Sequence, residues 1–246
     1  MRGLSDVRPG DDLAAGLRAG LRALGGPLQP FDVVVVTHKV VSKAERCLVD
    51  LATITPSARA RELAQAGGND PRLIEVVLRE TVRIVRADPR VLVCETRHGL
   101  VCANAGVDRS NVAGGEVVTV LPPDPDRSAA GLRAALLEDA AGGPLGVVLT
   151  DTFGRPFRLG GVNVAVGVAG MPATTDHTGL VDSAGYLLQA GLIGSADEIA
   201  AAAELVMGKT DGIPAVRLRG LRWEGEGRAA DLLRPAGEDV FRGTGP

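Results

Sequence analysis

The clearest pattern in the sequence is a change from helical to extended spacing of apolar residues near its beginning. Leu13, Leu17 and Leu21 recur at the spacing of one helical face, and Leu24 continues it. The Gly-Gly-Pro of residues 25–27 is typical of the end of such a helix. Residues 32–37 then form a nearly continuous valine run, which predicts a strand buried on both faces.

Further apolar runs predict strands over residues 91–96, 100–104, 145–150, 161–170 and 214–218. Residues that can cap a first turn predict helix starts at Thr55 and Asp70, each followed by proline, and at Ser128 and Ser195. The last two helices are expected to run to about residues 141 and 207. This order predicts a mixed α/β fold with several mixed sheets flanked by helices. The length fits a single unit over residues 1–246, which can contain two intimately packed subdomains.

Composition narrows the possible partners. A formal net charge of -3 gives no general attraction to nucleic acid or to an anionic membrane, and one Trp and one Tyr leave few rings on which bases could stack. No apolar run is long enough to span a bilayer and no signal peptide is recognised, so the cytoplasm is the expected location. Cys47, Cys94 and Cys102 form no CxxC pair, which argues against a disulfide framework and against a zinc site.

Two aspartates, Asp108 and Asp151, stand in abrupt polar stretches that follow short apolar runs. Two carboxylates at strand ends suit Mg²⁺ or Mn²⁺, which prefer oxygen ligands and keep waters or substrate phosphates in the rest of their shell. With the Thr152 hydroxyl, these carboxylates could suffice as a metal site. The simpler interpretation is that each aspartate forms a turn or caps a helix.

Cationic side chains cluster just past the valine strand. His38, Lys39, Ser42 and Lys43 follow it directly, and such a cluster suits an anionic ligand such as a triphosphate. The alternative is that both lysines are solvated surface charges. His98 has two interpretations as well, either contact with substrate or a hydrogen-bonded histidine in a turn.

The tripeptide at residues 208–210, Gly-Lys-Thr, resembles the end of a phosphate-binding P-loop. That motif requires a glycine five positions earlier, where Ala203 stands, and a strand before the loop with a helix after it. Here a predicted helix precedes the loop and a predicted strand follows it. We therefore reject the P-loop interpretation.

Three stretches, residues 36–45, 102–111 and 150–158, resemble the signatures of the coenzyme F420-0:L-glutamate ligase family, the gamma-glutamyl ligases that complete the deazaflavin coenzyme. Further matching blocks lie within residues 3–13 and at 196–198 and 207–220, so the resemblance covers nearly the whole chain. It implies an acid–amino-acid ligase that uses GTP to phosphorylate the carboxylate of a deazaflavin acceptor, after which the amine of L-glutamate attacks the acyl phosphate. It also implies an intertwined homodimer. The chain is similar to the stand-alone form, without the nitroreductase-like domain of two-domain relatives, so no flavin is expected.

The same resemblance implies roles for individual residues. Asp108, Asp151 and Thr152 would hold Mg²⁺ or Mn²⁺, and Arg155 is a candidate to stabilise charge on the transferred phosphoryl group. The nucleotide-binding residues implied by the family are Leu4, Ser5, Asp6, Val7, His38, Lys39, Lys43, Asn111, Met207, Gly208, Lys209, Thr210, Asp211, Gly212 and Ile213.

The sequence departs from the family pattern at three positions. Leu180 stands where an arginine is expected, and Ala184 where an aromatic residue is expected. Lys209 replaces an acidic residue that, in archaeal relatives, serves a second cation. The first two departures favour an alternative, a paralogous amide ligase with another acceptor or amino acid. The third favours a nucleotide-binding protein without ligase turnover.

Overall fold

A computed structural model describes residues 1, 4, 6–110, 116–138 and 140–241 of the chain. The predicted fold class is confirmed, since the architecture is mixed α/β with several sheets. The helices are α1 (Leu13–Ala23), α2 (His38–Ala44), α3 (Ala58–Gly67), α4 (Pro71–Arg79), α5 (Pro125–Leu137) and α6 (Ser195–Met207), with 3-10 turns η1 (Leu51–Thr53), η2 (Asn104–Gly106) and η3 (Ala229–Leu232). The strands are β1 (Asp32–Thr37), β2 (Leu48–Asp50), β3 (Thr81–Asp88), β4 (Val91–Thr96), β5 (Val101–Ala103), β6 (Val117–Thr119), β7 (Leu145–Arg155), β8 (Arg158–Ala169), β9 (Thr175–Asp176), β10 (Leu192–Ile193) and β11 (Ala215–Leu218).

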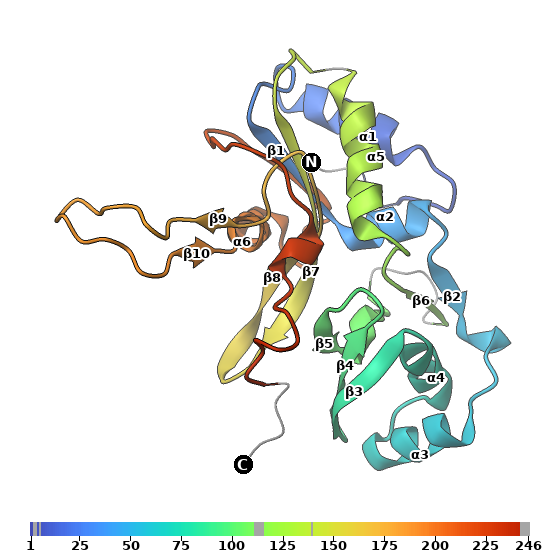
Figure 1. The fold of residues 1–246 in the computed structure, drawn as a ribbon. Helices are drawn as coiled ribbons and strands as arrows, with labels where there is room; N and C mark the ends of the chain where they lie inside the picture. The colour runs from blue at the N-terminus through green and yellow to red at the C-terminus, as the bar shows by residue number, and fades with distance from the viewer. Residues whose placement is uncertain (2–3, 5, 111–115, 139, 242–246) are drawn as a thin grey trace.

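A four-stranded sheet in the order β11-β1-β7-β8 organises the fold. Strands β1 and β7 are parallel, whereas β11 and β8 pair antiparallel with them. The valine run of β1 is completely buried because its alternate side chains enter different cores. Val34 and Val36 pack toward α1 and α5, and Val33 and Val35 pack toward α6. Figure 1 shows these helices on opposite faces of the sheet.

A second group of elements has a core of its own. Helices α3 and α4 pack against the three-stranded sheet β3-β4-β5, and the pair β2-β6 leads back to the first group. Figure 1 shows this group below the large sheet. The strands β9 and β10 form the base of an arm that projects away from the large sheet on its α6 side. Within the described residues, no helix is both long and apolar enough to cross a membrane.

Several predicted boundaries are wrong, each because another residue provides the cap. Helix α3 starts after Ser57, whose hydroxyl accepts the Ala60 N–H, and not at Thr55-Pro56. Helix α5 is capped by Asp124 instead of Ser128 and ends at Leu137. Ser195 is the first residue of α6 rather than its cap. The capping box predicted from Ser195 and Glu198 is not formed, and the Ser195 hydroxyl lies 2.6 Å from that of Thr175 instead.

The boundary that matters most for the site is that of the strand predicted for residues 145–150. Strand β7 does not stop before Asp151 but continues to Arg155, because β8 pairs with it as far as Arg158. Pairing with β1, in contrast, ends at Thr37 opposite Thr150. Asp151 therefore lies inside a strand, at the point where one of its two neighbours has ended.

Candidate functional site

A pocket opens where β1 ends beside β7, with about 700 Å³ of space that includes part of the solvent at its mouth. Helix α2 forms one wall, β7 and β8 form the floor, and the loop after α6 forms the other wall. Its lining residues are Thr37, Lys39, Val40, Lys43, Asp151, Thr152, Asn163, Glu204, Met207, Gly208, Lys209, Gly212, Ile213 and Pro214. Most predicted nucleotide-binding residues of α2 and of the loop are thus brought together.

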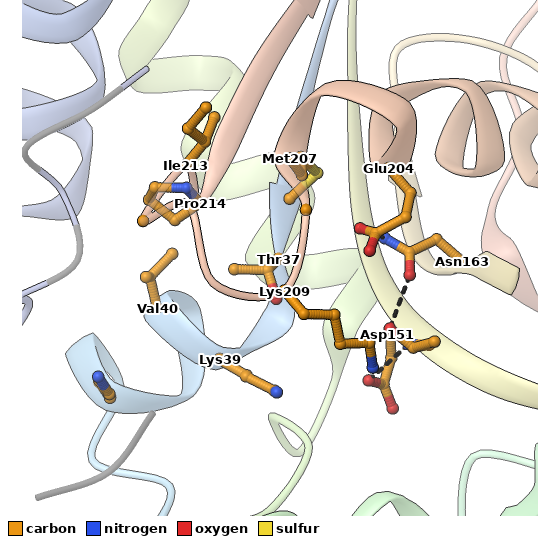
Figure 2. A pocket seen from close by; sticks show the side chains of 14 residues that line it. Thr37, Lys39, Val40, Asp151, Asn163, Glu204, Met207, Lys209, Ile213 and Pro214 are labelled. Atoms are coloured by element: carbon orange, nitrogen blue, oxygen red, sulfur yellow. Dashed lines mark hydrogen bonds between the residues drawn. The ribbon is translucent and has the colours of Figure 1, made fainter. Parts of the chain in front are cut away.

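Three lysines reach this pocket from two directions. Strand β1 passes into α2 without an intervening residue, so Lys39 and Lys43 lie one turn apart on the same helix face. Figure 2 shows the Lys39 and Lys209 side chains directed toward the side of the pocket where Asp151 lies. Burial lowers the pKa of Lys43, and the nearby carboxylate of Asp6 opposes this change. The pocket therefore offers a cationic lining for a polyanion.

Asp151 is held by groups behind the pocket. The ring of His38 is completely buried and its Nε2 lies 3.4 Å from the Asp151 carboxylate, which also accepts the Thr152 backbone N–H at 2.7 Å. Burial would raise the pKa of Asp151, but the His38 ring, this N–H and Lys39 outweigh it and lower the pKa. His38 is therefore a support for Asp151 and is absent from the pocket lining.

The His38 ring is itself oriented by a hydrogen-bond chain. The Ser42 hydroxyl donates to the carbonyl oxygen of Val120 at 2.7 Å, so its one proton is already used. The Ser42 oxygen lies 3.2 Å from His38 Nδ1, and this contact fixes the plane of the ring. This arrangement directs Nε2 toward Asp151.

Asp108 approaches the same lysine from another part of the chain. Its carboxylate lies 2.7 Å from Lys39 Nζ and accepts the N–H and hydroxyl of Ser110 at 2.6 and 2.9 Å. Burial opposes ionisation, but Lys39 and Ser110 outweigh it and lower the pKa of Asp108. The backbone of Asp108 is fixed by two hydrogen bonds with Thr119, through which β6 supports the site. Both predicted metal-binding carboxylates are thus ionised at neutral pH and face one ammonium group.

The structure adds two pocket residues that the sequence did not indicate, Asn163 and Glu204. The Thr152 hydroxyl is 2.7 Å from Asn163 Oδ1, and Asn163 Nδ2 donates to a Glu204 carboxylate oxygen at 2.9 Å. Asn163 lies directly opposite Thr152 in the β7–β8 pair, and Glu204 comes from α6, which packs on β8. Only the strand register and this helix packing bring the three together.

These groups fit a divalent cation that takes few ligands from the protein. Within the described residues there is no cluster of three or more His, Cys, Asp or Glu side chains of the kind that binds zinc. Mg²⁺ and Mn²⁺ need less, since waters and phosphate oxygens complete their shell. The ionised carboxylates of Asp108 and Asp151 and the hydroxyl of Thr152 supply oxygen ligands of the required kind.

Other predicted site residues lie elsewhere. Arg155 is exposed at the far end of β7 and donates to the carbonyl oxygens of Leu159 and Gly160 in its own hairpin, at 2.6 and 3.1 Å. Leu4 and Val7 pack against the core under α1. His98 is the turn histidine of the simpler interpretation, with Nε2 2.9 Å from the Pro122 carbonyl oxygen.

The remaining predicted residues fall into three groups. Thr210 and Asp211 belong to the loop after α6 but do not line the pocket. Leu180 and Ala184 lie on the exposed arm between β9 and β10. Ser5 and Asn111 lie outside the described residues. None of these positions tests the predicted roles, which stay predictions.

Comparison with known proteins agrees with the sequence signatures. Residues 3–220 match the family described as F420-0:Gamma-glutamyl ligase. The coenzyme F420:L-glutamate ligase of Methanopyrus kandleri is 48% identical over 242 residues, covering 96% of this chain and 93% of that protein. The ligase of the same name from Methanothermobacter thermautotrophicus is 45% identical, covering 99% and 97%. That of Archaeoglobus fulgidus is 42% identical, covering 98% and 94%.

Proposed function

The chain belongs to the F420-0:gamma-glutamyl ligase family, and we propose that it joins L-glutamate to the deazaflavin coenzyme F420-0 as an acid–amino-acid ligase. The ligase activity rests on the relatives of that name, which match nearly the whole chain. The use of GTP rests on the pocket, which three lysines and the ionised Asp151 line, with the ionised Asp108 paired to one of these lysines. The combination suits transfer of a phosphoryl group rather than binding alone.

Amide formation from a carboxylate requires activation, because the oxygen of a carboxylate is a poor leaving group. In the proposed reaction an acceptor carboxylate oxygen attacks the γ-phosphorus of GTP, and the bond to GDP breaks. The amine of L-glutamate then attacks the carbonyl carbon of this acyl phosphate, inorganic phosphate leaves, and the amine loses a proton. Such transfer depends mainly on positioning and on neutralising phosphate charge.

The pocket residues have distinct roles in this scheme. Asp108, Asp151 and Thr152 would hold Mg²⁺ or Mn²⁺, which supplies charge neutralisation for the phosphates when bound. Lys39, Lys43 and the loop of residues 207–213 would bind the phosphates. His38 would act from behind, by orienting Asp151. Arg155 stays a candidate for phosphoryl stabilisation, a role that requires its side chain to leave its own hairpin or to reach the pocket of a second subunit.

The decisive experiment measures GDP release with GTP and Mn²⁺ or Mg²⁺, with and without L-glutamate and F420-0, and the mass of the product. A mass gain of one or more glutamyl units that requires all components supports the proposal. Nucleotide binding without product would favour the paralogous ligase that Leu180 and Ala184 suggest. In that case the acceptor and the amino acid would be varied. If no combination of acceptor and amino acid gives a product, a nucleotide-binding protein without turnover would be favoured.

We further propose that two copies assemble into the functional protein. The arm between β9 and β10 projects from the chain (Figure 1) and exposes apolar side chains, with Val181, Tyr186 and Leu192 64%, 60% and 66% exposed. A projecting apolar arm of this kind is typical of a segment that another copy covers. Light scattering should give the mass of a dimer, and Val181→Asp with Tyr186→Asp should give a monomer. A monomeric unmodified protein would contradict this proposal.

A further inference from the structure

The side chains of Thr152, Asn163 and Glu204 form a series of two hydrogen bonds. Elementary chemistry fixes the direction of this series, that is, which group donates and which accepts in each bond. Glu204 as a carboxylate can only accept, so the Asn163 group that faces it at 2.9 Å must be the NH₂. The Asn163 oxygen is then turned toward Thr152, 2.7 Å away. The reverse orientation of this amide would place two acceptor oxygens against each other at Glu204.

The consequence falls on the Thr152 hydroxyl. An amide oxygen cannot donate, so the single proton of Thr152 must point toward Asn163. Thr152 lines the pocket beside Asp151, and with its proton directed to Asn163 its lone pairs are left for the pocket. Without Asn163 the same hydroxyl could rotate and present its proton to the pocket, and a proton cannot face a cation.

We propose that Asn163 and Glu204 are positioning residues that hold the Thr152 hydroxyl as an oxygen donor to the divalent cation. This inference rests on the proposed function, because it takes Thr152 and Asp151 as the cation site. Glu204 determines the direction of both hydrogen bonds, since its negative charge selects the orientation of the Asn163 amide. The packing of α6 on β8 brings it there, so a helix far along the chain determines the polarity of a group on β7.

Two replacements at Glu204 separate its role in orienting the Asn163 amide from a direct electrostatic effect of its charge on the cation. In Glu204→Gln the side-chain oxygen can still accept from Asn163, so the observed direction stays accessible, although the Gln NH₂ also permits the reverse direction. In Glu204→Leu and in Asn163→Ala the direction is lost. Partners that orient metal ligands commonly change metal affinity by about tenfold or more, and we expect about tenfold weaker binding in these two variants. Glu204→Gln should stay within about twofold of the unmodified protein.

The test measures Mn²⁺ binding to the full chain without nucleotide, by paramagnetic resonance of the free ion. Thr152→Val, which removes the hydroxyl at nearly constant shape, is the reference. Adding Asn163→Ala to Thr152→Val should weaken Mn²⁺ no further, because the group to be oriented is already gone. Asp197→Ala is the matched control. It removes another hydrogen bond from α6 to β8, at Ala165, and should leave Mn²⁺ affinity unchanged.

Each result is decisive. Weaker Mn²⁺ binding in Asn163→Ala and Glu204→Leu, retained binding in Glu204→Gln, and no additive effect with Thr152→Val support the proposal. Normal affinity in Asn163→Ala, or an equal loss in Glu204→Gln and Glu204→Leu, overturns it while the cation site stands. An unmodified protein that binds no Mn²⁺ overturns the cation site of the proposed function, and this inference with it.

Discussion

Removing the charge of Lys39 should change the affinities for Mn²⁺ and for GTP in opposite directions. Its ammonium lies 2.7 Å from an Asp108 carboxylate oxygen, so a cation that binds Asp108 must compete with it. Lys39→Met keeps an apolar side chain of similar length and removes the charge. We expect the variant to bind Mn²⁺ more tightly when nucleotide is absent. It should bind GTP more weakly, since the same ammonium is proposed to contact the phosphates.

The size of the gain follows from the geometry. Two unit charges 2.7 Å apart interact by about 1.5 kcal/mol in the dielectric of water and by about 6 kcal/mol at an effective value of about 20. The two side chains are 15% and 35% exposed, so the interaction lies between these two values, and the lower value sets the smallest expected gain. A gain of about 1.4 kcal/mol corresponds to about tenfold tighter binding of Mn²⁺.

The assay is a pair of titrations at neutral pH, one with Mn²⁺ and one with GTP. The matched control is Lys43→Met, which removes a charge from the same pocket but leaves the Asp108 ion pair intact. It should weaken GTP binding without strengthening Mn²⁺ binding. Unchanged or weaker Mn²⁺ binding in Lys39→Met would refute the reasoning, because Asp108 would then not be a cation ligand released by loss of the ammonium.

Two further predictions concern stability and are checked by urea unfolding. Arg219→Met should lower the urea concentration at the unfolding midpoint, because it leaves the fully buried Asp32 carboxylate without its two-pronged partner. Burial would raise the pKa of Asp32, but Arg219 and a backbone N–H outweigh it and lower the pKa. The stability that this ion pair contributes is therefore full above about pH 4 and is lost as the pH falls through the pKa of Asp32 in the folded protein. A loss of stability in Arg219→Met that does not shrink in acid would contradict this explanation. Gly167→Ala should cost about 3 kcal/mol, since a Cβ there would collide with the Pro125 carbonyl oxygen, whereas Gly154→Ala, with open space around it, should change the stability little. Equal effects of the two glycine replacements would contradict the clash.

Much of the fold could be predicted because its determinants are local in the sequence. The spacing of Leu13, Leu17 and Leu21 identifies α1, and the valine run identifies β1 with its observed bounds. Asp70-Pro71 identifies the start of α4. Boundaries failed where two capping residues compete, as at Asp124 and Ser128, because the choice depends on where the next turn packs.

The residues of the site, like the elements of the fold, could be predicted only where a local sequence pattern marks them. Asp108, Asp151 and the α2 lysines could be identified from motifs, and the structure brings them to one region. Asn163 and Glu204 could not be identified, since nothing local distinguishes them from other polar residues on a strand and a helix. Their importance arises from the register of β7 on β8 and from the packing of α6, which a sequence does not state.

The unequal lengths of β1 and β7 have a consequence for how this family can vary. The pocket lies in the step where β1 ends at Thr37 while β7 continues, and β1 joins α2 with no spare residue between them. Lengthening β1 by one or two residues would extend its pairing over Asp151 and carry the lysines of α2 out of register. The residues of this junction can therefore be exchanged more freely than they can be added or removed. Insertions should collect instead in segments such as the arm between β9 and β10, where length does not affect the step.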